Sequence, residues 1–398
     1  MSDKADEERH QLLTSAGAGE AAPAIGLRHV VLGLCTLCAA LCYADRTNLS
    51  VALIAMQREH SWPPSTAGAL LSAFFWGYIF TQIPGGLCAA TFGAKRTLVV
   101  GVSLWSALTL VTPWCAFAST TLLFAARVCV GLAEGVAIPC LTALVAAWAP
   151  PSERSRGLAL VACGGFVGTV SAYSCAGMVD RWWPGIFYLF GSLGLLWALV
   201  FEIVAASTPA ESALLPTAER RSLLQGAVGS PAVLVAGGAN DAAIGAQELR
   251  PVPWRRLLRD PAFLSICLAH FATNWGHYLL LTWLPSYLTS LGLRLDSAAA
   301  LFSLPYVGAI LTGNAGGWVA DELLQRRLGW TVRSTRKAMQ TVGHAVPAAC
   351  FGLLCTTASP NTATALLTVA ISAASFSHSG YNASGWLTSR PLSPKPQP

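Results

Sequence analysis

Ten long apolar runs dominate the pattern of hydrophobic and polar positions along this chain. A membrane-spanning helix needs about 20 mainly apolar residues. The runs that reach this length are 29–56, 67–92, 97–118, 122–148, 157–178, 186–206, 262–288, 298–319, 339–357 and 363–386. Six runs precede a long polar stretch and four follow it. The pattern therefore predicts an all-α membrane protein with two helical bundles.

The composition agrees with this pattern. Hydrophobic residues make up 54% of the 398 residues and charged residues only 11%, against roughly 25% charged in an ordinary soluble domain. The mean hydropathy is +0.53. A soluble chain of this size could not cover its surface with so few charges, which excludes a soluble enzyme, a nucleic-acid-binding protein and a disordered chain. The net charge of +6 is therefore no sign of DNA or RNA binding.

The positions of the runs divide the chain into five segments. We expect a cytosolic N-terminal tail over 1–28, a six-helix bundle over 29–206, a cytosolic and partly disordered central loop over 207–259, a partial four-helix bundle over 260–386 and a Pro-rich tail over 387–398. With the N-terminus in the cytosol, the cytosolic side carries 18 Lys and Arg residues and the opposite side carries three. This excess of positive charge predicts the orientation.

Three charged residues interrupt the apolar runs. Arg46 lies in the first run, and Arg127 and Glu134 lie in the fourth. An ionisable group inside a membrane costs at least about 2.5–3.5 kcal/mol and usually faces a cavity or a partner. Arg127 and Glu134 are close to two helical turns apart, so they share one face of a helix. We expect the arginines to attract an anion and Glu134 to gain or lose a proton. The alternative is a structural ion pair of Arg127 with a carboxylate such as Asp45.

Other candidate residues carry weaker signals. His277 lies in the seventh run and can carry a proton near neutral pH, so it is a second candidate for coupling, with a packing role as the alternative. Cys35 and Cys38 form a CxxC pair inside an apolar run, and we expect the cysteines to pack as small apolar residues. The chain has no Walker pattern, so the sequence predicts no cofactor and no ATP-driven pumping.

Two predicted bundles joined by a cytosolic loop resemble transporters of the major facilitator superfamily. After the second run, GGLCAATFGAKR is similar to the superfamily's Gly-x-x-x-Asp-Arg-x-Gly-Arg-Arg gate motif, and GGWVADELL is the matching segment after the eighth run. Ala90 replaces the expected acid in the first segment, whereas Asp321 retains it in the second. The resemblance implies that Lys95, Arg96 and Asp321 take part in gating.

A finer resemblance is to the anion:cation symporter branch of this superfamily, which includes sodium/phosphate cotransporters, vesicular nucleotide and glutamate carriers and plant phosphate carriers. The segments that carry it stand in the family's order: YADRTNLSVAL (43–53), SAFFWGYIFTQIPGG (72–86), ARVCVGLAEG (126–135), WAPPSERSRG (148–157), IFYLFGSLGLLW (186–197), VPWRRLLRDPAF (252–263) and NWGHYLLLTWLPSYL (274–288). This resemblance implies a secondary transporter that works by alternating access, coupled to H⁺, Na⁺ or the membrane potential.

The same resemblance implies roles for individual residues. Arg46 and Arg127 are implicated in anion binding and Glu134 in cation coupling. Three further candidates for substrate binding lie in the matching segments: Tyr78, Asn274 and Tyr278. We expect a small anion as the substrate, either phosphate, a nucleotide or an organic anion.

Two departures from the vesicular glutamate carriers make glutamate a less favoured substrate. Those carriers have a histidine where this chain has Leu71 and an arginine where it has Thr273. A sugar or drug carrier of the same superfamily is disfavoured by the two arginines inside the runs.

The end of the chain raises an alternative. Family members continue past the Ser-Gly-Tyr-Asn motif, here Ser379–Asn382, into two more spans, whereas this chain ends in a polar, Pro-rich segment. The alternative is a truncated, non-transporting isoform or an incomplete gene model of such a carrier.

The expected location is an endomembrane, a vesicle or the plasma membrane, with the lipid bilayer, the anion and a coupling cation as partners and no nucleic acid. Glu8–Leu13 match an acidic dileucine sorting pattern, for which an unstructured tail is the alternative.

Overall fold

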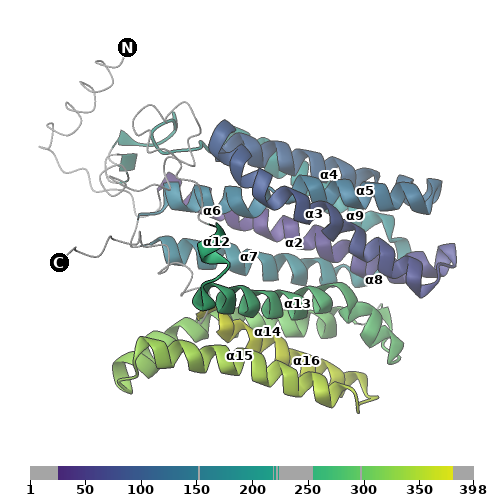
Figure 1. Ribbon diagram of the computed structural model, residues 1–398. Helices are drawn as coiled ribbons and strands as arrows, with labels where there is room; N and C mark the ends of the chain where they lie inside the picture. Colours follow the sequence, from purple (N-terminus) through teal and green to yellow (C-terminus); the bar gives the residue numbers. More distant parts are fainter. Residues whose placement is uncertain are drawn as a thin grey trace, which may run out of the picture. The chain divides into compact units, whose positions relative to one another are not determined.

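Helices make up every regular element in the part of the chain that the computed structural model describes, residues 26–150, 153–217, 219–220, 223, 254–295 and 298–379. The first half of the chain contains α2 (Leu27–His60), α3 (Pro64–Phe92), α4 (Ala94–Ala118), α5 (Thr120–Glu134), α6 (Ala137–Trp148), α7 (Arg154–Ser174), α8 (Ala176–Trp182) and α9 (Pro184–Val204) (Figure 1). The second half contains α12 (Trp254–Leu257), α13 (Pro261–Ser290), α14 (Ala299–Trp318), the π-helix η3 (Val319–Arg327), α15 (Val332–Leu354), α16 (Pro360–Ala374) and the 3₁₀ turn η4 (Ser375–Ser379).

The predicted all-α membrane fold is confirmed. Among the described residues, six helical segments are long and apolar enough to cross a membrane: Leu27–His60, Pro64–Phe92, Ala94–Ala118, Thr120–Trp148, Arg156–Ser174 and Pro184–Val204. They coincide with the first six apolar runs of the sequence. The four later runs are also helical in α13 to α16 and η4, the tenth as far as Ser379, the last residue described.

A break divides the fourth run, where the sequence pattern predicts one continuous helix. α5 ends at Glu134, and α6 begins at Ala137. Pro139 follows closely and has no N–H with which to donate to the Gly135 carbonyl four residues earlier, so the regular hydrogen-bond ladder is interrupted here. The break places Glu134 at a helix end.

The helices group into two compact units that cut across the two halves of the sequence. The first unit comprises Met1–Cys42, Gly68–Gly165 and Phe187–Ala246, and the second comprises Tyr43–Ala67, Phe166–Ile186 and Gln247–Pro398. The second unit thus combines the later part of α2, the end of α7 and α8 with the helices of the second half. The division of the chain into two sequential bundles stays a prediction.

In the first unit, α3 and α5 approach each other at glycines. A Cβ atom added at Gly77 would collide with the Val128 carbonyl oxygen, and one added at Gly131 would collide with the Phe74 carbonyl oxygen. The two backbones are therefore in direct contact, which small residues permit between membrane helices. α4 packs against α5 and α6.

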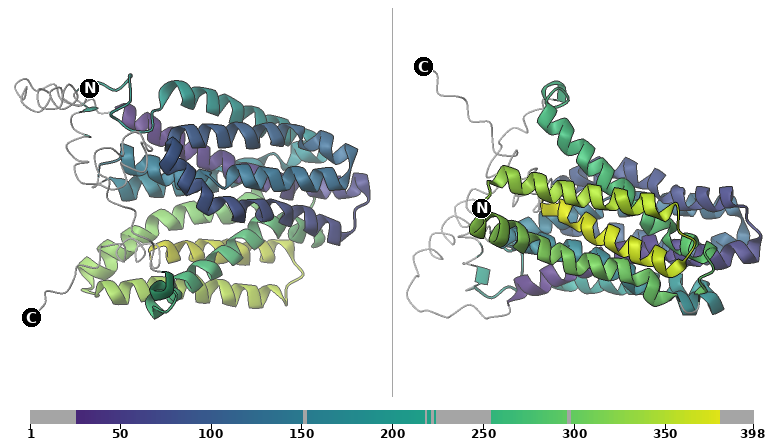
Figure 2. Two further views of the ribbon diagram at one scale, coloured as in Figure 1. Left: turned by 45° about the horizontal axis from the view of Figure 1, so that its top comes forward. Right: turned by 90° about the horizontal axis from the view of Figure 1, so that it is seen from below.

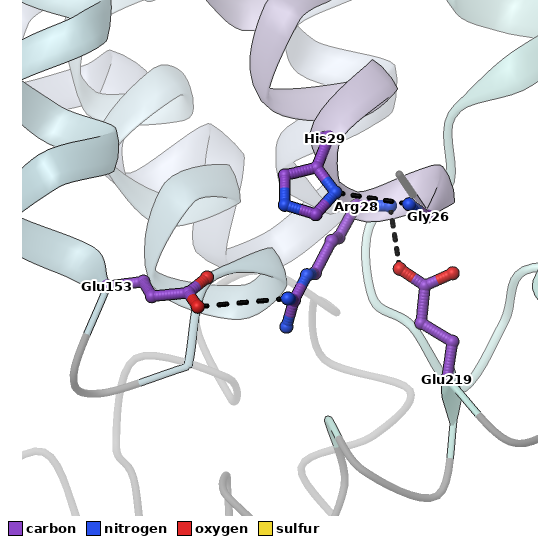
Figure 3. Close-up of polar contacts among 5 residues, drawn as sticks. All are labelled: Gly26, Arg28, His29, Glu153 and Glu219. Atoms are coloured by element: carbon purple, nitrogen blue, oxygen red, sulfur yellow. Dashed lines mark hydrogen bonds and ion pairs between the residues drawn. The ribbon is translucent and has the colours of Figure 1, made fainter. Parts of the chain in front are cut away.

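The start of α2 is capped by an acidic side chain from the polar stretch after α9. The Glu219 carboxylate accepts hydrogen bonds from the backbone N–H groups of Leu27 at 3.0 Å and Arg28 at 3.1 Å, and the Arg28 guanidinium lies 3.7 Å from Glu153 (Figure 3). The first N–H groups of a helix have no acceptor within it. Glu219, which lies 192 positions after Leu27 in the chain, supplies the acceptor here.

The start of α4 and the end of α9 also lie together in the first unit. Lys95 Nζ donates to the Glu202 carbonyl at 2.8 Å and lies 3.0 Å from the Glu202 carboxylate. The sequence places both residues on the same side of the membrane, and helices that cross alternately would bring these two ends together.

In the second unit, α16 packs against both α14 and α15, and α13 also contacts α16 (Figures 1 and 2, green to yellow). Thr312 of α14 donates its hydroxyl to the Ser372 carbonyl of α16 at 2.9 Å. Hydroxyl groups that bond across helices are typical of membrane bundles.

Candidate functional site

α5 buries two of the residues that the sequence singles out. Arg127 is 2% exposed and Glu134 is 0% exposed. Both project from the same helix, about 10 Å apart along its axis at about 1.5 Å per residue. The positive and the negative charge are therefore inside the protein, as the charge pattern predicts.

Aromatic side chains of α3 line the Arg127 guanidinium. Arg127 Cζ lies 5.9 Å from the centre of the Phe74 ring, and the Phe74 and Tyr78 rings stack 5.4 Å apart. A guanidinium over an aromatic face is attracted by the ring's quadrupole. The structure thus brings the predicted Tyr78 to the neighbourhood of Arg127, through Phe74, a residue that the sequence reasoning missed.

Gln82 is a second residue that the sequence reasoning missed. Its side-chain amide donates to the Gly135 carbonyl at 3.2 Å. Pro139 cannot donate to that carbonyl because it has no N–H. Gln82 of α3 supplies the missing donor, at the residue directly after Glu134. We call Phe74, Tyr78, Gln82, Arg127 and Glu134 the α5 cluster.

A different cluster surrounds Arg46 in the second unit. The Arg46 guanidinium donates to the Tyr278 hydroxyl at 3.1 Å, although the two residues are 232 positions apart. Arg46 Cζ also lies 4.8 Å from the centre of the Tyr43 ring and 5.8 Å from that of Tyr278. Arg46 is 6% exposed. The structure therefore brings two of the predicted candidates, Arg46 and Tyr278, into direct contact.

His277 joins this second group through its ring. Its imidazole lies 5.9 Å from the Tyr43 ring, 5.5 Å from the Tyr278 ring and 6.1 Å from the Phe166 ring, measured between ring centres. We call Tyr43, Arg46, His277 and Tyr278 the α2–α13 cluster. The role of His277 in coupling stays a prediction.

The remaining predicted residues lie apart from these contacts. Asn274 donates to the His270 carbonyl of its own helix at 2.9 Å. Lys95 is engaged with Glu202, and Arg96 is exposed. The Asp321 side chain lies outside the described residues. The gating role of these three charged residues and the substrate contact of Asn274 stay predictions.

Buried charged side chains distinguish both clusters. Within the described ranges, no group of three or more His, Cys, Asp or Glu side chains could hold a metal ion. Cys35 and Cys38 are both 0% exposed inside α2, which suits small packing residues. What the two clusters provide is a guanidinium against aromatic rings in each and a carboxyl group at the end of α5.

Long apolar helices that bury charged side chains define an integral, multi-pass membrane protein. Residues 35–391 match the family model of the Major Facilitator Superfamily. The chain belongs to this superfamily, and the resemblance noted in the sequence is confirmed.

Curated relatives bear the names of anion transporters rather than enzymes. The chain is 36% identical to "Probable anion transporter 4, chloroplastic" of Oryza sativa subsp. japonica, over 89% of this chain and 57% of the relative. It is 38% identical to "Sodium-dependent phosphate transport protein 1, chloroplastic" of Arabidopsis thaliana, over 81% of this chain and 60% of the relative. It is 36% identical to "Ascorbate transporter, chloroplastic" of the same plant, over 89% and 62%. The chain thus spans about three fifths of the length of these relatives.

Solved structures show the same fold. A bacterial homologue of the human lysosomal transporter Spinster, in an inward-facing and unoccupied conformation, matches 91% of this chain and 75% of its own, with a TM-score of 0.62 and 19% identity. The xylose transporter XylE from E. coli, in a partially occluded inward-open conformation, matches over 88% of this chain and 85% of the XylE chain, with a TM-score of 0.64 and 16% identity. At these identities the likeness concerns the fold alone.

Proposed function

We propose that this protein is a secondary transporter of a small anion and that it works by alternating access. The observation that carries the proposal is the Arg127 guanidinium, 2% exposed on a membrane helix. A buried charge of this kind is costly and is typical of substrate or ion pathways. The relatives named for phosphate and ascorbate support an anion as the substrate, and Arg46 supplies a second buried guanidinium.

Glu134 links anion binding to a cation. When Glu134 is ionised, it offsets the charge of Arg127 on the same helix. When it takes up a proton, the charge of Arg127 is no longer offset. Over about 10 Å and at an effective dielectric constant of about 20, this difference is on the order of 1–2 kcal/mol, or roughly tenfold in anion affinity. The anion and the proton would therefore bind together, and a sodium ion at the carboxylate would have the same effect.

The working membrane is the next part of the proposal. The relatives are named as chloroplast proteins, so we place this protein in the membrane of a chloroplast or a related organelle rather than in a vesicle or the plasma membrane. Imaging a fluorescent fusion against organelle markers tests this location, and signal at the plasma membrane would contradict it.

Uptake by the purified protein in liposomes tests the transport function. We expect liposomes loaded with unlabelled phosphate or ascorbate to accumulate the labelled anion, more strongly under an inward H⁺ or Na⁺ gradient. Arg127→Ala should reduce uptake at least about 100-fold, since a buried charge partner of the anion is lost.

A matched control is Arg326→Ala, because the Arg326 side chain is 79% exposed and pairs only with Glu322 of its own turn among the described residues. Its uptake should equal that of the wild type. Uptake by Arg127→Ala at the wild-type rate, or no uptake of any small anion by well-folded wild type, would refute the proposed function.

A further inference from the structure

Pro285 leaves a backbone carbonyl of α13 without its helical donor. Proline has no N–H and its ring crowds the carbonyl four residues earlier, which here belongs to Leu281. Leu281 is 1% exposed, and a buried carbonyl without a partner is costly. The Tyr173 hydroxyl of α7 donates to this carbonyl at 3.3 Å. A side chain from another helix thus replaces the missing N–H.

Tyr173 is the meeting point of four helices in the second unit. Its ring lies 5.5 Å from the Tyr306 ring and 5.8 Å from the Phe302 ring of α14. Ser50 of α2 lies near the Tyr173 hydroxyl. Tyr173, Tyr306, Phe302 and Ser50 are all 0% exposed. The hydroxyl therefore lies in a buried contact between α2, α7, α13 and α14, where a hydrogen bond is stronger than in water.

The same stretch of α13 carries a residue of the α2–α13 cluster. Tyr278 precedes Leu281 by about one helical turn and accepts the hydrogen bond from Arg46. Residues 278–285 thus contact the first half of the chain through Tyr278, which meets α2, and through the Leu281 carbonyl, which meets α7. The stretch ends at the proline, where α13 bends most easily.

The first unit also contains a carbonyl that a proline leaves without a donor and that a side chain from another helix satisfies. Gln82 of α3 donates to the Gly135 carbonyl, which Pro139 leaves without a donor. In each unit, a side chain from a neighbouring helix satisfies a proline-released carbonyl beside a candidate site residue, Glu134 in one and Tyr278 in the other.

We propose that Tyr173 is a positioning residue: its hydroxyl holds the Pro285-weakened stretch of α13 so that Tyr278 stays against Arg46. When this hydrogen bond is released, residues 278–285 can bend away from α2 and α7, since the Leu281 carbonyl has no helical N–H to hold it. For its effect on transport this inference rests on the proposed function, whereas the hold on α13 does not depend on it.

Backbone hydrogen exchange tests the hold on α13 directly. In the full-length protein in lipid nanodiscs, Tyr173→Phe keeps the ring and removes only the hydroxyl. Because one buried hydrogen bond is lost, we expect peptides over 278–290 to exchange about three to ten times faster than in the wild type. Tyr287→Phe is the matched control on α13, since the Tyr287 hydroxyl makes no hydrogen bond with any described residue, and it should exchange as the wild type does.

Pro285→Ala supplies the decisive second variant. It restores a backbone N–H at position 285 that can donate to the Leu281 carbonyl, so the Tyr173 hydroxyl is no longer needed there. Adding Tyr173→Phe to Pro285→Ala should therefore change exchange over 278–290 by less than about twofold, against the three- to tenfold effect in the wild-type background. A simple packing role of Tyr173 would give the same increase in both backgrounds. Equal increases, or unchanged exchange in Tyr173→Phe alone, would overturn the inference.

Transport separates this inference from the proposed function. Tyr173→Phe should raise the KM for the anion about three- to tenfold while kcat changes less, because Tyr278 is held less firmly at Arg46. If the wild type transports no anion and the exchange results are as expected, the proposed function fails and the positioning role stands. If the wild type transports and exchange is unaffected by Tyr173→Phe, the positioning role fails and the function stands.

Discussion

The α5 cluster and the α2–α13 cluster use the same chemistry in different settings. In each, an arginine that is at most 6% exposed lies against aromatic rings. The α5 cluster is built on neighbouring helices, α3 and α5, whose backbones touch at Gly77 and Gly131. The α2–α13 cluster joins residues 232 positions apart through side chains, by the hydrogen bond of Arg46 to Tyr278 and by the ring contact of Tyr43 with His277.

This difference indicates that the charge of Arg127 is held in a fixed position and that the contact of Arg46 with Tyr278 can change. Direct backbone contact leaves no room for adjustment, because close-packed interiors are not continuously deformable. A side-chain hydrogen bond to a charged group can break and re-form at the cost of about 1.5 kcal/mol. We therefore propose that the α5 cluster binds the anion and the cation and that the contact of Arg46 with Tyr278 in the α2–α13 cluster changes during transport.

Glycine substitutions give the largest expected contrast between the two regions. Gly131→Ala would force α3 away from α5, since the added Cβ meets the Phe74 backbone, and should destabilise the protein by about 1–3 kcal/mol. Gly276→Ala in α13 meets no atom within 4 Å and should be neutral or stabilise by up to about 1 kcal/mol. Thermal unfolding of both variants in the same detergent measures this. Equal stability of the two variants would contradict the distinction between the close-packed contact of α3 with α5 and the less crowded α13.

Tyr278→Phe tests the changeable contact. The variant keeps the ring beside Arg46 and removes the hydroxyl that accepts its hydrogen bond. Loss of a hydrogen bond to a charged group predicts an effect of about 1.5 kcal/mol, or roughly tenfold, mainly on the KM for the anion. Uptake kinetics measure the effect, and Tyr287→Phe on the same helix serves as the control. A change confined to thermal stability would mean that the bond is structural only.

Phe74→Leu gives the smallest expected effect. It removes the ring beside Arg127 and keeps an apolar side chain, so the loss of the cation–π contact should weaken anion affinity about two- to fivefold. Phe80→Leu is the control, because Phe80 lies on the same helix and is 67% exposed. If both variants behave alike, the ring of Phe74 has no part in the site.

Much of this picture could be predicted from the sequence. The apolar runs coincide with the observed helices because a stretch of about 20 apolar residues without backbone partners in lipid must form a helix. Arg127, Glu134 and Arg46 stood out because charges are rare in such runs, and the structure buries all three. The location of the break after Glu134 was missed, although Pro139 signals it.

The tertiary partners could not be predicted in the same way. Pro139 and Pro285 show that the carbonyls of Gly135 and Leu281 lose a donor, but nothing local indicates that Gln82 and Tyr173 replace it. Similarly, the contact of Arg46 with Tyr278 depends on how α2 and α13 meet in space. Such pairs follow from the packing of whole helices rather than from any periodicity.

The central claim is that Glu134 controls the affinity of the α5 cluster for the anion, and Glu134→Gln tests it most directly. The measurement is the equilibrium affinity of the wild type and of Glu134→Gln for the transported anion, from mildly acidic to mildly alkaline pH. At each pH the ratio of the two affinities is taken, so that the titration of the anion itself cancels. We predict equal affinities at any pH at which Glu134 is protonated, because Glu134→Gln mimics the neutral carboxyl group, and roughly tenfold tighter binding by Glu134→Gln at any pH at which the wild-type carboxylate is ionised and offsets Arg127. A ratio that stays constant with pH would contradict the account.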